Sequence, residues 1–377
     1  MRKYLDYNAT APLRRESRQA MQDAFELCGN PSSVHAEGRA ARALVEAARR
    51  DVAALADAPP REVTFTASGT EAANMALTPG VSAPGVGPLQ RLIVGASEHA
   101  CVLAGHRFPE WAVAPVRPDG VIDLDALEAL LKGAPPALVA IQAANNETGV
   151  LQPIAEAAAR VHAHGGLLVC DAAQAAGRIP LGPFRDADAL LLSAHKFGGP
   201  KGAGACLGLR DGLHFNALLR GGGQERGRRA GTENVAAIAG FGAAARAVAA
   251  GTEVEAARLA ALRDACARRL AELAPDAVVF GAEAPRLPNT LAFAIPGLAA
   301  ATLLMRLDLE GVAASSGSAC SSGKVSPSHV LAAMGVAPTL ATGAIRVSFG
   351  WASDETDVEA FAQAMARTLA GLRRKGR

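Results

Sequence analysis

The stretch Leu167-Leu-Val-Cys-Asp-Ala-Ala-Gln174 decides the fold class, because a short apolar run of strand length ends in a carboxylate and an amide. Ala189-Leu-Leu-Leu-Ser-Ala-His-Lys196 follows the same design, with a lysine just after the strand. Continuous apolar strands of this kind are typical of parallel sheets that are covered by helices on both faces. Ligands of such sheets bind where the carboxyl ends of strands meet helix N-termini. The residues that follow these strands are therefore the first candidates for chemistry.

The same alternation of strands and Ala-rich helices extends outward from about residue 60 to about residue 250. A helix is predicted at Ile154–His162, between two of the strands. The predicted strands are Glu62–Thr66, Arg91–Val94, Ala137–Ile141, Leu167–Cys170 and Ala189–Leu192. This alternation predicts an α/β fold with a parallel sheet.

The rhythm of the sequence changes after residue 251. Long amphipathic helices are predicted at Thr252–Leu273 and at about Asp354–Leu372. The shorter elements between them are strands at Val278–Phe280, Thr290–Ala294 and Ala344–Phe349 and a helix at Ala299–Leu307. This part of the chain is predicted to form a smaller α+β lobe.

Composition and charge argue against several classes of protein. The 377 residues carry 38 basic and 36 acidic side chains, and a net charge of +2 lacks the global basic field of a dedicated nucleic-acid binder. There is no apolar signal region, and no apolar run approaches the roughly 18–20 residues that span a bilayer. The six cysteines are scattered without a C-x-x-C pair, which favours a reducing cytoplasm over a disulfide framework or zinc site. His162 and His164 do not share a helix face, so no metal site is expected.

Asp171 and Lys196 are candidates for chemistry because each lies at the end of a buried strand. A carboxylate there can hold a cationic ring nitrogen, although an aspartate in this place can also be a helix N-cap. Burial would lower the pKa of a lysine and make its amine nucleophilic enough for a Schiff base. Lys201 is the rival, in a glycine-rich turn that suits a solvated or structural role.

For four further segments the sequence allows both a functional and a purely structural interpretation. Ala67-Ser-Gly-Thr-Glu71 lies between a strand and a helix and could bind a phosphate, without the spacing of a P-loop. The glycine–arginine run 221–232 suits an anion or interface role, or a plain surface loop. His99 could stack on an aromatic cofactor and shuttle protons, or be a structural histidine. Cys320, in the small and polar run 315–323, could be an exposed reactive thiol or an incidental loop cysteine.

Taken together and in this order, these segments resemble a cysteine desulfurase, a pyridoxal-phosphate enzyme of the class V aminotransferase group. The match is closest to the nitrogen-fixation and iron–sulfur-assembly branch, and it covers nearly the whole chain. The segments that carry it are Tyr4–Pro12, Asn30–His35, Phe65–Glu71, Glu98–His99, Asn145–Gly149, Asp171–Gln174, Ser193–Lys196, Arg229–Thr232, Ser315–Cys320 and Ile345–Phe349.

The resemblance implies the fold of pyridoxal-phosphate enzymes of fold type I, in two domains. The large cofactor-binding domain, with a mostly parallel mixed sheet, would comprise residues 16–250. The smaller α+β domain would comprise residues 251–377 and carry the catalytic-cysteine loop. Residues 1–15 would form an N-terminal segment that joins the small domain.

Carried over position by position, the resemblance also implies a set of cofactor contacts. Lys196 would hold the cofactor as a Schiff base, Asp171 would pair with the pyridinium nitrogen, and Gln174 would hydrogen-bond the ring hydroxyl. His99 would stack on the ring, and Asn146 would lie beside the ring and the substrate. The phosphate would be held by Gly69, Thr70, Ser193 and His195, with Thr232 reaching in from the neighbouring subunit of a homodimer.

The implied reaction converts L-cysteine to L-alanine and leaves the sulfur as a persulfide on Cys320. Arg346 would grip the substrate carboxylate, released Lys196 would take the α-proton, and His99 is a candidate for generating the Cys320 thiolate. The expected partner is a sulfur-acceptor protein such as an iron–sulfur scaffold. The alternatives are a selenocysteine lyase or related class V enzyme at the same cofactor site, and a non-catalytic sulfur carrier that has kept the fold.

Overall fold

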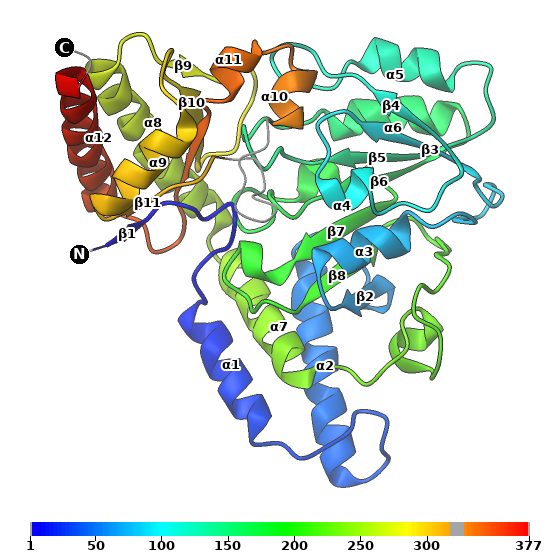
Figure 1. The fold of residues 1–377 in the computed structure, drawn as a ribbon. Helices are drawn as coiled ribbons and strands as arrows, with labels where there is room; N and C mark the ends of the chain where they lie inside the picture. The colour runs from blue at the N-terminus through cyan, green and yellow to red at the C-terminus, as the bar shows by residue number, and fades with distance from the viewer. Residues whose placement is uncertain (1, 317–327, 376–377) are drawn as a thin grey trace.

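The computed structural model describes residues 2–316 and 328–375, so Cys320 lies outside the described residues. Its main feature is a seven-stranded sheet (Figure 1). In spatial order its strands are β2 (Val63–Thr66), β8 (Gly204–Gly208), β7 (Ala189–Ser193), β6 (Leu167–Asp171), β5 (Leu138–Gln142), β3 (Arg91–Gly95) and β4 (Glu110–Ala114). Only β8 runs against its neighbours, so the mostly parallel mixed sheet is confirmed.

Two strands of this sheet were not predicted from the sequence. β4 is an edge strand with the short apolar run Trp111–Ala114, and unlike the central strands it leaves Trp111 (46%) and Val113 (43%) exposed. β8 is short, begins and ends in glycine, and follows the glycine-rich turn after Lys196. It lies between β2 and β7 and makes the sheet mixed, whereas the alternation of strands and helices had indicated parallel strands only.

Apolar residues on both faces of the large sheet are buried, as the continuous apolar strands predict. Leu190 and Leu192 of β7 pack on one face with α2 (Ala36–Ala54), α5 (Leu124–Leu131), α6 (Ile154–Ala163) and α7 (Val235–Ala249). Ala189 and Leu191 pack on the opposite face with α3 (Gly69–Ala76) and α4 (Ala100–Leu103). α1 (Arg15–Phe25) packs against α7, which packs in turn against α2 (Figure 1).

A second hydrophobic core lies in the C-terminal part of the chain. Its antiparallel sheet has the order β12 (Ile345–Ser348), β10 (Thr290–Ala294), β9 (Val278–Val279). α8 (Thr252–Leu273), α9 (Ala300–Leu309) and α12 (Glu355–Lys375) pack around this core, and α10 (His329–Ala333) and α11 (Pro338–Ala341) pack beside it. β1 (Lys3–Tyr4) pairs in parallel with β11 (Val312–Ala313), so the N-terminal residues lie against the C-terminal part of the chain (Figure 1).

The junction between the two parts lies at residues 250–251, between α7 and α8. The predicted boundaries of the domains stay a prediction, supported by the separate cores on either side of this junction. Within the described residues no single helix is long and apolar enough to cross a membrane. Of the described helices, only α7 and α8 taken together, with a bend of 77° between them, have the length and composition of a membrane-spanning segment.

Candidate active site

A cavity of about 270 Å³ lies at the carboxyl ends of β6 and β7 and at the N-terminus of α3. Its wall contains nine of the side chains or glycines singled out from the sequence. They are Gly69, Thr70, His99, Asn146, Asp171, Gln174, Ser193, His195 and Lys196. The chain thus brings residues from five separate stretches of sequence to one place.

Lys196 ends the short turn that follows β7, and its amine is held by the N-terminal segment. The Nζ atom donates hydrogen bonds to the carbonyl oxygens of Asn8 (2.8 Å) and Ala9 (3.1 Å). Burial, with the positive charges of Arg178 and Arg346, lowers the pKa of Lys196 to about 8. The neutral, nucleophilic amine is therefore available near neutral pH. The rival Lys201 is exposed and does not line this cavity.

Asp171 is the last residue of β6, and its carboxylate faces the cavity. The Oδ1 atom accepts a hydrogen bond from the backbone N–H of Ala173 (2.9 Å). The residues that follow form turns rather than a helix, so the alternative of a helix N-cap is wrong. Burial raises the pKa of Asp171, while the neighbouring His99 and Lys196 lower it. An ionised carboxylate in this place gains from a cationic group beside it.

The N-terminus of α3 is closed on one side by its own capping residues. Ser68 accepts a hydrogen bond from the N–H of Glu71 (3.1 Å), and Glu71 in turn accepts one from the N–H of Ala67 (2.9 Å). A Cβ added to Gly69 would lie 3.1 Å from the Cβ of Ser193, so the glycine allows α3 to begin close to the end of β7. N–H groups of the first helical turn, which have no partner within a helix, therefore lie beside a serine hydroxyl.

The two histidines of the cavity are held in the neutral form. Burial and the nearby Lys196, Lys201 and Arg178 lower the pKa of His195 to about 4, and its Nδ1 lies 3.2 Å from the Thr10 hydroxyl. Burial lowers the pKa of His99 as well. A neutral imidazole offers one N–H hydrogen-bond donor and one nitrogen that can accept a proton, without bringing a permanent charge to the site.

His99 has the structural role left open in the sequence, and it also lines the cavity. It is the N-cap of α4, and its Nδ1 accepts a hydrogen bond from the backbone N–H of Cys101 (3.1 Å). The Cys101 Sγ lies 3.0 Å from the same nitrogen. Because Nδ1 is the acceptor, the ring proton resides on Nε2. Cys101 itself lines the cavity and was missed, since nothing in its local sequence distinguishes it from an ordinary helix residue.

A buried arginine, Arg178, was also missed by the sequence analysis. Its Nη1 donates to the side-chain oxygen of Gln174 (2.7 Å), and the Gln174 Nε2 donates to the carbonyl of Asn8 (3.0 Å). The orientation of the Gln174 amide is therefore determined by its partners. The only signal in the sequence was a charged residue in the otherwise uncharged run 175–184.

Two of the expected site residues within the described part of the chain, Arg346 and Thr232, do not line this cavity. Arg346, on β12, is 4% exposed and donates to the carboxylate of Asp6 and to the carbonyl of Asn146, both at 2.7 Å. It is thus paired already, although its Nε is buried without a partner among the described residues. Thr232 is exposed on the glycine–arginine loop. Cys320 lies outside the described residues.

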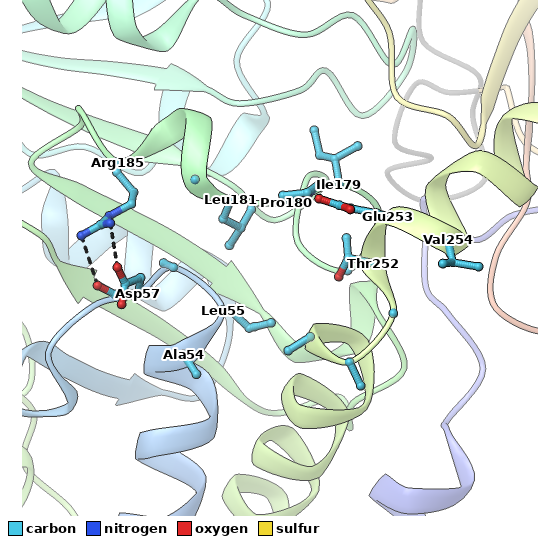
Figure 2. Close-up of a pocket in the computed structure, with 16 residues that line it drawn as sticks. Ala54, Leu55, Asp57, Ile179, Pro180, Leu181, Arg185, Thr252, Glu253 and Val254 are labelled. Carbon is cyan, nitrogen blue, oxygen red and sulfur yellow. Dashed lines mark hydrogen bonds and ion pairs between the residues drawn. The ribbon is translucent and has the colours of Figure 1, made fainter.

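A second cavity, of about 450 Å³, lies between the C-terminal end of α2, the loop 177–185 and the junction of α7 with α8 (Figure 2). Most residues of its wall are small or apolar, and it contains none of the predicted site residues. Arg185 and Asp57 form an ion pair of 2.7 Å there, and both side chains are at least half exposed.

Comparison with known proteins gives one consistent result. A family model described as aminotransferase class-V matches residues 3–361. The chain is 42% identical to a cysteine desulfurase of Cereibacter sphaeroides, over 99% of this chain and 97% of that protein. It is 39% identical to the cysteine desulfurase IscS of Dictyoglomus turgidum, over 98% of this chain and 95% of that protein. The crystal structure of a NifS-like protein from Rickettsia africae matches with a TM-score of 0.89 at 32% identity, over 98% of this chain and all of that one.

Proposed function

The chain belongs to the aminotransferase class-V family, and from that premise we propose that it is a pyridoxal-phosphate-dependent cysteine desulfurase. It converts L-cysteine to L-alanine and carries the sulfur as a persulfide on Cys320. The observation that carries the proposal is the meeting of Asp171 and Lys196 in one cavity beside the N-terminus of α3. The cysteine desulfurases that match the chain over almost its full length support the same activity.

The residues of the cavity fit pyridoxal phosphate. For a phosphate, the first turn of α3 and the hydroxyls of Thr70 and Ser193 offer donors, and Gly69 leaves space that a Cβ would fill. For a protonated ring nitrogen, Asp171 offers a half-buried carboxylate. The Gln174 amide, with its oxygen held by Arg178, presents its nitrogen as a donor for the ring hydroxyl. When bound, the cofactor supplies an electron sink for the charge that develops at the substrate α-carbon.

Lys196 moves the protons of the reaction. Its pKa of about 8 lets the amine release a proton near neutral pH, and the released amine can take the α-proton of the substrate. To generate a thiolate, His99 would accept the thiol proton at Nδ1, because its ring proton is on Nε2, and Nδ1 would then give up its hydrogen bond from the backbone N–H of Cys101. In the cofactor-free chain the carbonyls of Asn8 and Ala9 hold the lysine amine in the cavity.

Arg346 is proposed to bind the substrate carboxylate, and this requires an exchange of partners. In the described structure one edge of its guanidinium is occupied by Asp6 and by the carbonyl of Asn146. The buried Nε without a partner leaves one donor for an incoming carboxylate. Binding of the substrate would therefore compete with Asp6.

The remaining proposals concern partners and location. Thr232 is exposed on a loop whose Arg229 binds Glu71 of the α3 cap at 2.8 Å, which supports a role for this loop at the phosphate end of a homodimer. The sulfur acceptor is a protein such as an iron–sulfur scaffold, and the scattered cysteines support a cytoplasmic location.

The decisive experiment is incubation of the cofactor-loaded protein with L-cysteine, with assays for alanine and for a persulfide mapped by mass spectrometry. We expect alanine to form and the persulfide to lie on Cys320. The Cys320→Ala variant should keep its visible cofactor absorbance and lose sulfur release, whereas Cys28→Ala, at an exposed cysteine, should behave as the parent protein.

Three outcomes would overturn the proposal. Unchanged desulfuration by Cys320→Ala would contradict the mechanism. Turnover of selenocysteine alone would indicate the lyase alternative. A colourless protein that cannot be reconstituted with pyridoxal phosphate would favour the non-catalytic carrier.

A further inference from the structure

Arg178 is a charged residue in an unusual environment. It lies in the turns after β6, is 4% exposed, and carries a guanidinium for which burial lowers the pKa to about 9. Every hydrogen bond that the described residues give it is to an uncharged oxygen: the carbonyls of Gln174, Tyr7 and Lys196 and the side-chain oxygen of Gln174. A buried cation without a carboxylate is costly, so the fold must gain something by keeping it.

The hydrogen bonds of Arg178 connect the chain segments that surround the reactive lysine. Nη1 binds the carbonyl (2.5 Å) and the side-chain oxygen (2.7 Å) of Gln174, while Nη2 binds the carbonyls of Tyr7 (3.0 Å) and Lys196 (3.3 Å). The carbonyl of Asn8 then accepts from both the Gln174 amide (3.0 Å) and the Lys196 amine (2.8 Å). One guanidinium thus joins the turn after β6, the turn after β7 and the N-terminal segment.

The charge of Arg178 also acts on the lysine amine. The charged groups that face Lys196 are Arg178, Arg346, Asp171 and Asp6, with His99 and His195 close by. Arg346 forms an ion pair with Asp6 at 2.7 Å, so their effects on the amine oppose each other. Arg178 has no such carboxylate partner among the described residues, and at the lysine amine its effect is opposed by Asp171, with which it makes no ion pair.

We propose that Arg178 is the positioning residue of the reactive lysine: its guanidinium aligns the Lys196 backbone with the Gln174 amide, and its positive charge favours the neutral Lys196 amine. The proposal rests on the proposed function, because Lys196 is the reactive amine only in a pyridoxal-phosphate enzyme. It assigns two separable actions to one side chain, charge and alignment.

The charge is tested on the full chain freed of cofactor, by trace acetylation over a range of pH with mass-spectrometric readout at each lysine. The exposed Lys201, five residues away, is the internal reference. In the parent protein the reactivity of Lys196 should level off above about pH 8. In Arg178→Met we expect this pH to rise by about one unit, which lowers the reactivity of Lys196 relative to Lys201 by about tenfold at neutral pH.

Alignment is tested with Arg178→Lys, which keeps the charge and loses the guanidinium fork. We expect its acetylation profile to stay within a few tenths of a pH unit of the parent, while pyridoxal phosphate dissociates faster from the loaded chain. The matched control is Arg14→Gln, because the Arg14 Nε binds the carbonyl of Phe197, the residue after Lys196, at 3.0 Å. This control should leave the acetylation profile of Lys196 unchanged.

Each outcome supports or overturns the inference. An equal shift in Arg178→Lys and Arg178→Met would show that the effect is structural, and no shift in a folded Arg178→Met would remove the role of the charge. If Arg178→Met does not fold, a shifted profile in Arg178→Lys alone is enough to overturn the proposal. Failure of the parent to produce alanine from L-cysteine would defeat the proposed function and leave the acetylation result intact.

Discussion

Of the two cavities, the smaller one contains the reactive side chains. The cavity at the ends of β6 and β7 is the smaller, at about 270 Å³ against about 450 Å³ for the one beside the α7–α8 junction. The smaller cavity collects a half-buried carboxylate, a lysine with a lowered pKa and two neutral histidines. The larger one, shown in Figure 2, is lined mostly by small and apolar residues, with one exposed ion pair and the exposed Glu253.

Two arginines on the connection between β6 and β7 show why the smaller cavity is the more reactive one. Arg178 is buried among carbonyl oxygens near Lys196, and Arg185, seven residues later, pairs with Asp57 at the surface. A charge in a poorly solvated place acts strongly on its neighbours, whereas water and salt screen the same charge at the surface. The reactive region is therefore identified by poorly solvated charged groups that lie close together, and not by the volume of the cavity.

The largest effect should come from Lys196→Ala. This change removes the amine that attaches the cofactor and moves the α-proton, so we expect alanine formation to fall by about 10⁴-fold or more. The measurement is the rate of alanine formation at saturating cysteine, together with the visible absorbance of the protein. Lys201→Ala is the matched control in the same turn and should retain near-parental activity. Comparable losses in both variants would contradict the assignment of Lys196.

Asp171→Asn should have the next largest effect. The amide cannot be ionised, so it loses a charge-assisted hydrogen bond worth roughly 1.5–3 kcal/mol, or about a 10- to 150-fold fall in kcat. The same substitution at Asp188, a buried aspartate outside the cavity that binds His162 and Arg210, should lower the free energy of unfolding with little effect on kcat. A kcat for Asp171→Asn equal to that of the parent would remove the ring-nitrogen partner from the mechanism.

Sequence reasoning succeeded where a residue's place in a strand decides its role. Asp171, Ser193 and Lys196 follow apolar strands, and the parallel pairing of β6 with β7 brings their ends to one edge of the sheet. It failed where the role depends on partners from distant segments. Arg178 gains its position from the N-terminal segment, and no local pattern reveals that contact.

Dependence on a partner from a distant segment also explains why the ion pair of Arg346 was not predicted. The sequence predicts that Arg346 grips the substrate carboxylate, which stays a prediction, and it gives no sign that the N-terminal segment places Asp6 at 2.7 Å from the guanidinium. Asp6 and Arg346 are 340 positions apart in the chain, so only the pairing of β1 with β11 and the contacts of the N-terminal segment with β12 bring them together.

The rate of cofactor uptake should depend on pH through the amine of Lys196, and no lysine among the described residues lines the larger cavity. The lowered pKa of Lys196 means that its amine is protonated below about pH 8 and neutral above it. The rate at which the cofactor-free chain takes up pyridoxal phosphate should therefore rise about fivefold from pH 7 to pH 8 and less than twofold from pH 8 to pH 9. Stopped-flow absorbance measures this rate, and a rise that continues to pH 10 would show an unperturbed lysine.

The smallest effect should come from the larger cavity itself, in the variant Arg185→Gln. Its partner Asp57 is well exposed, and ion pairs of this kind contribute about 0–1 kcal/mol to stability because water and salt screen them. We expect the free energy of unfolding, measured with urea, to fall by no more than that amount and kcat to stay unchanged. The pair should weaken further at high salt, which separates a screened charge effect from a packing effect. A marked loss of activity in Arg185→Gln would show that the α7–α8 junction is coupled to the reactive cavity, and the contrast between the two regions would no longer hold.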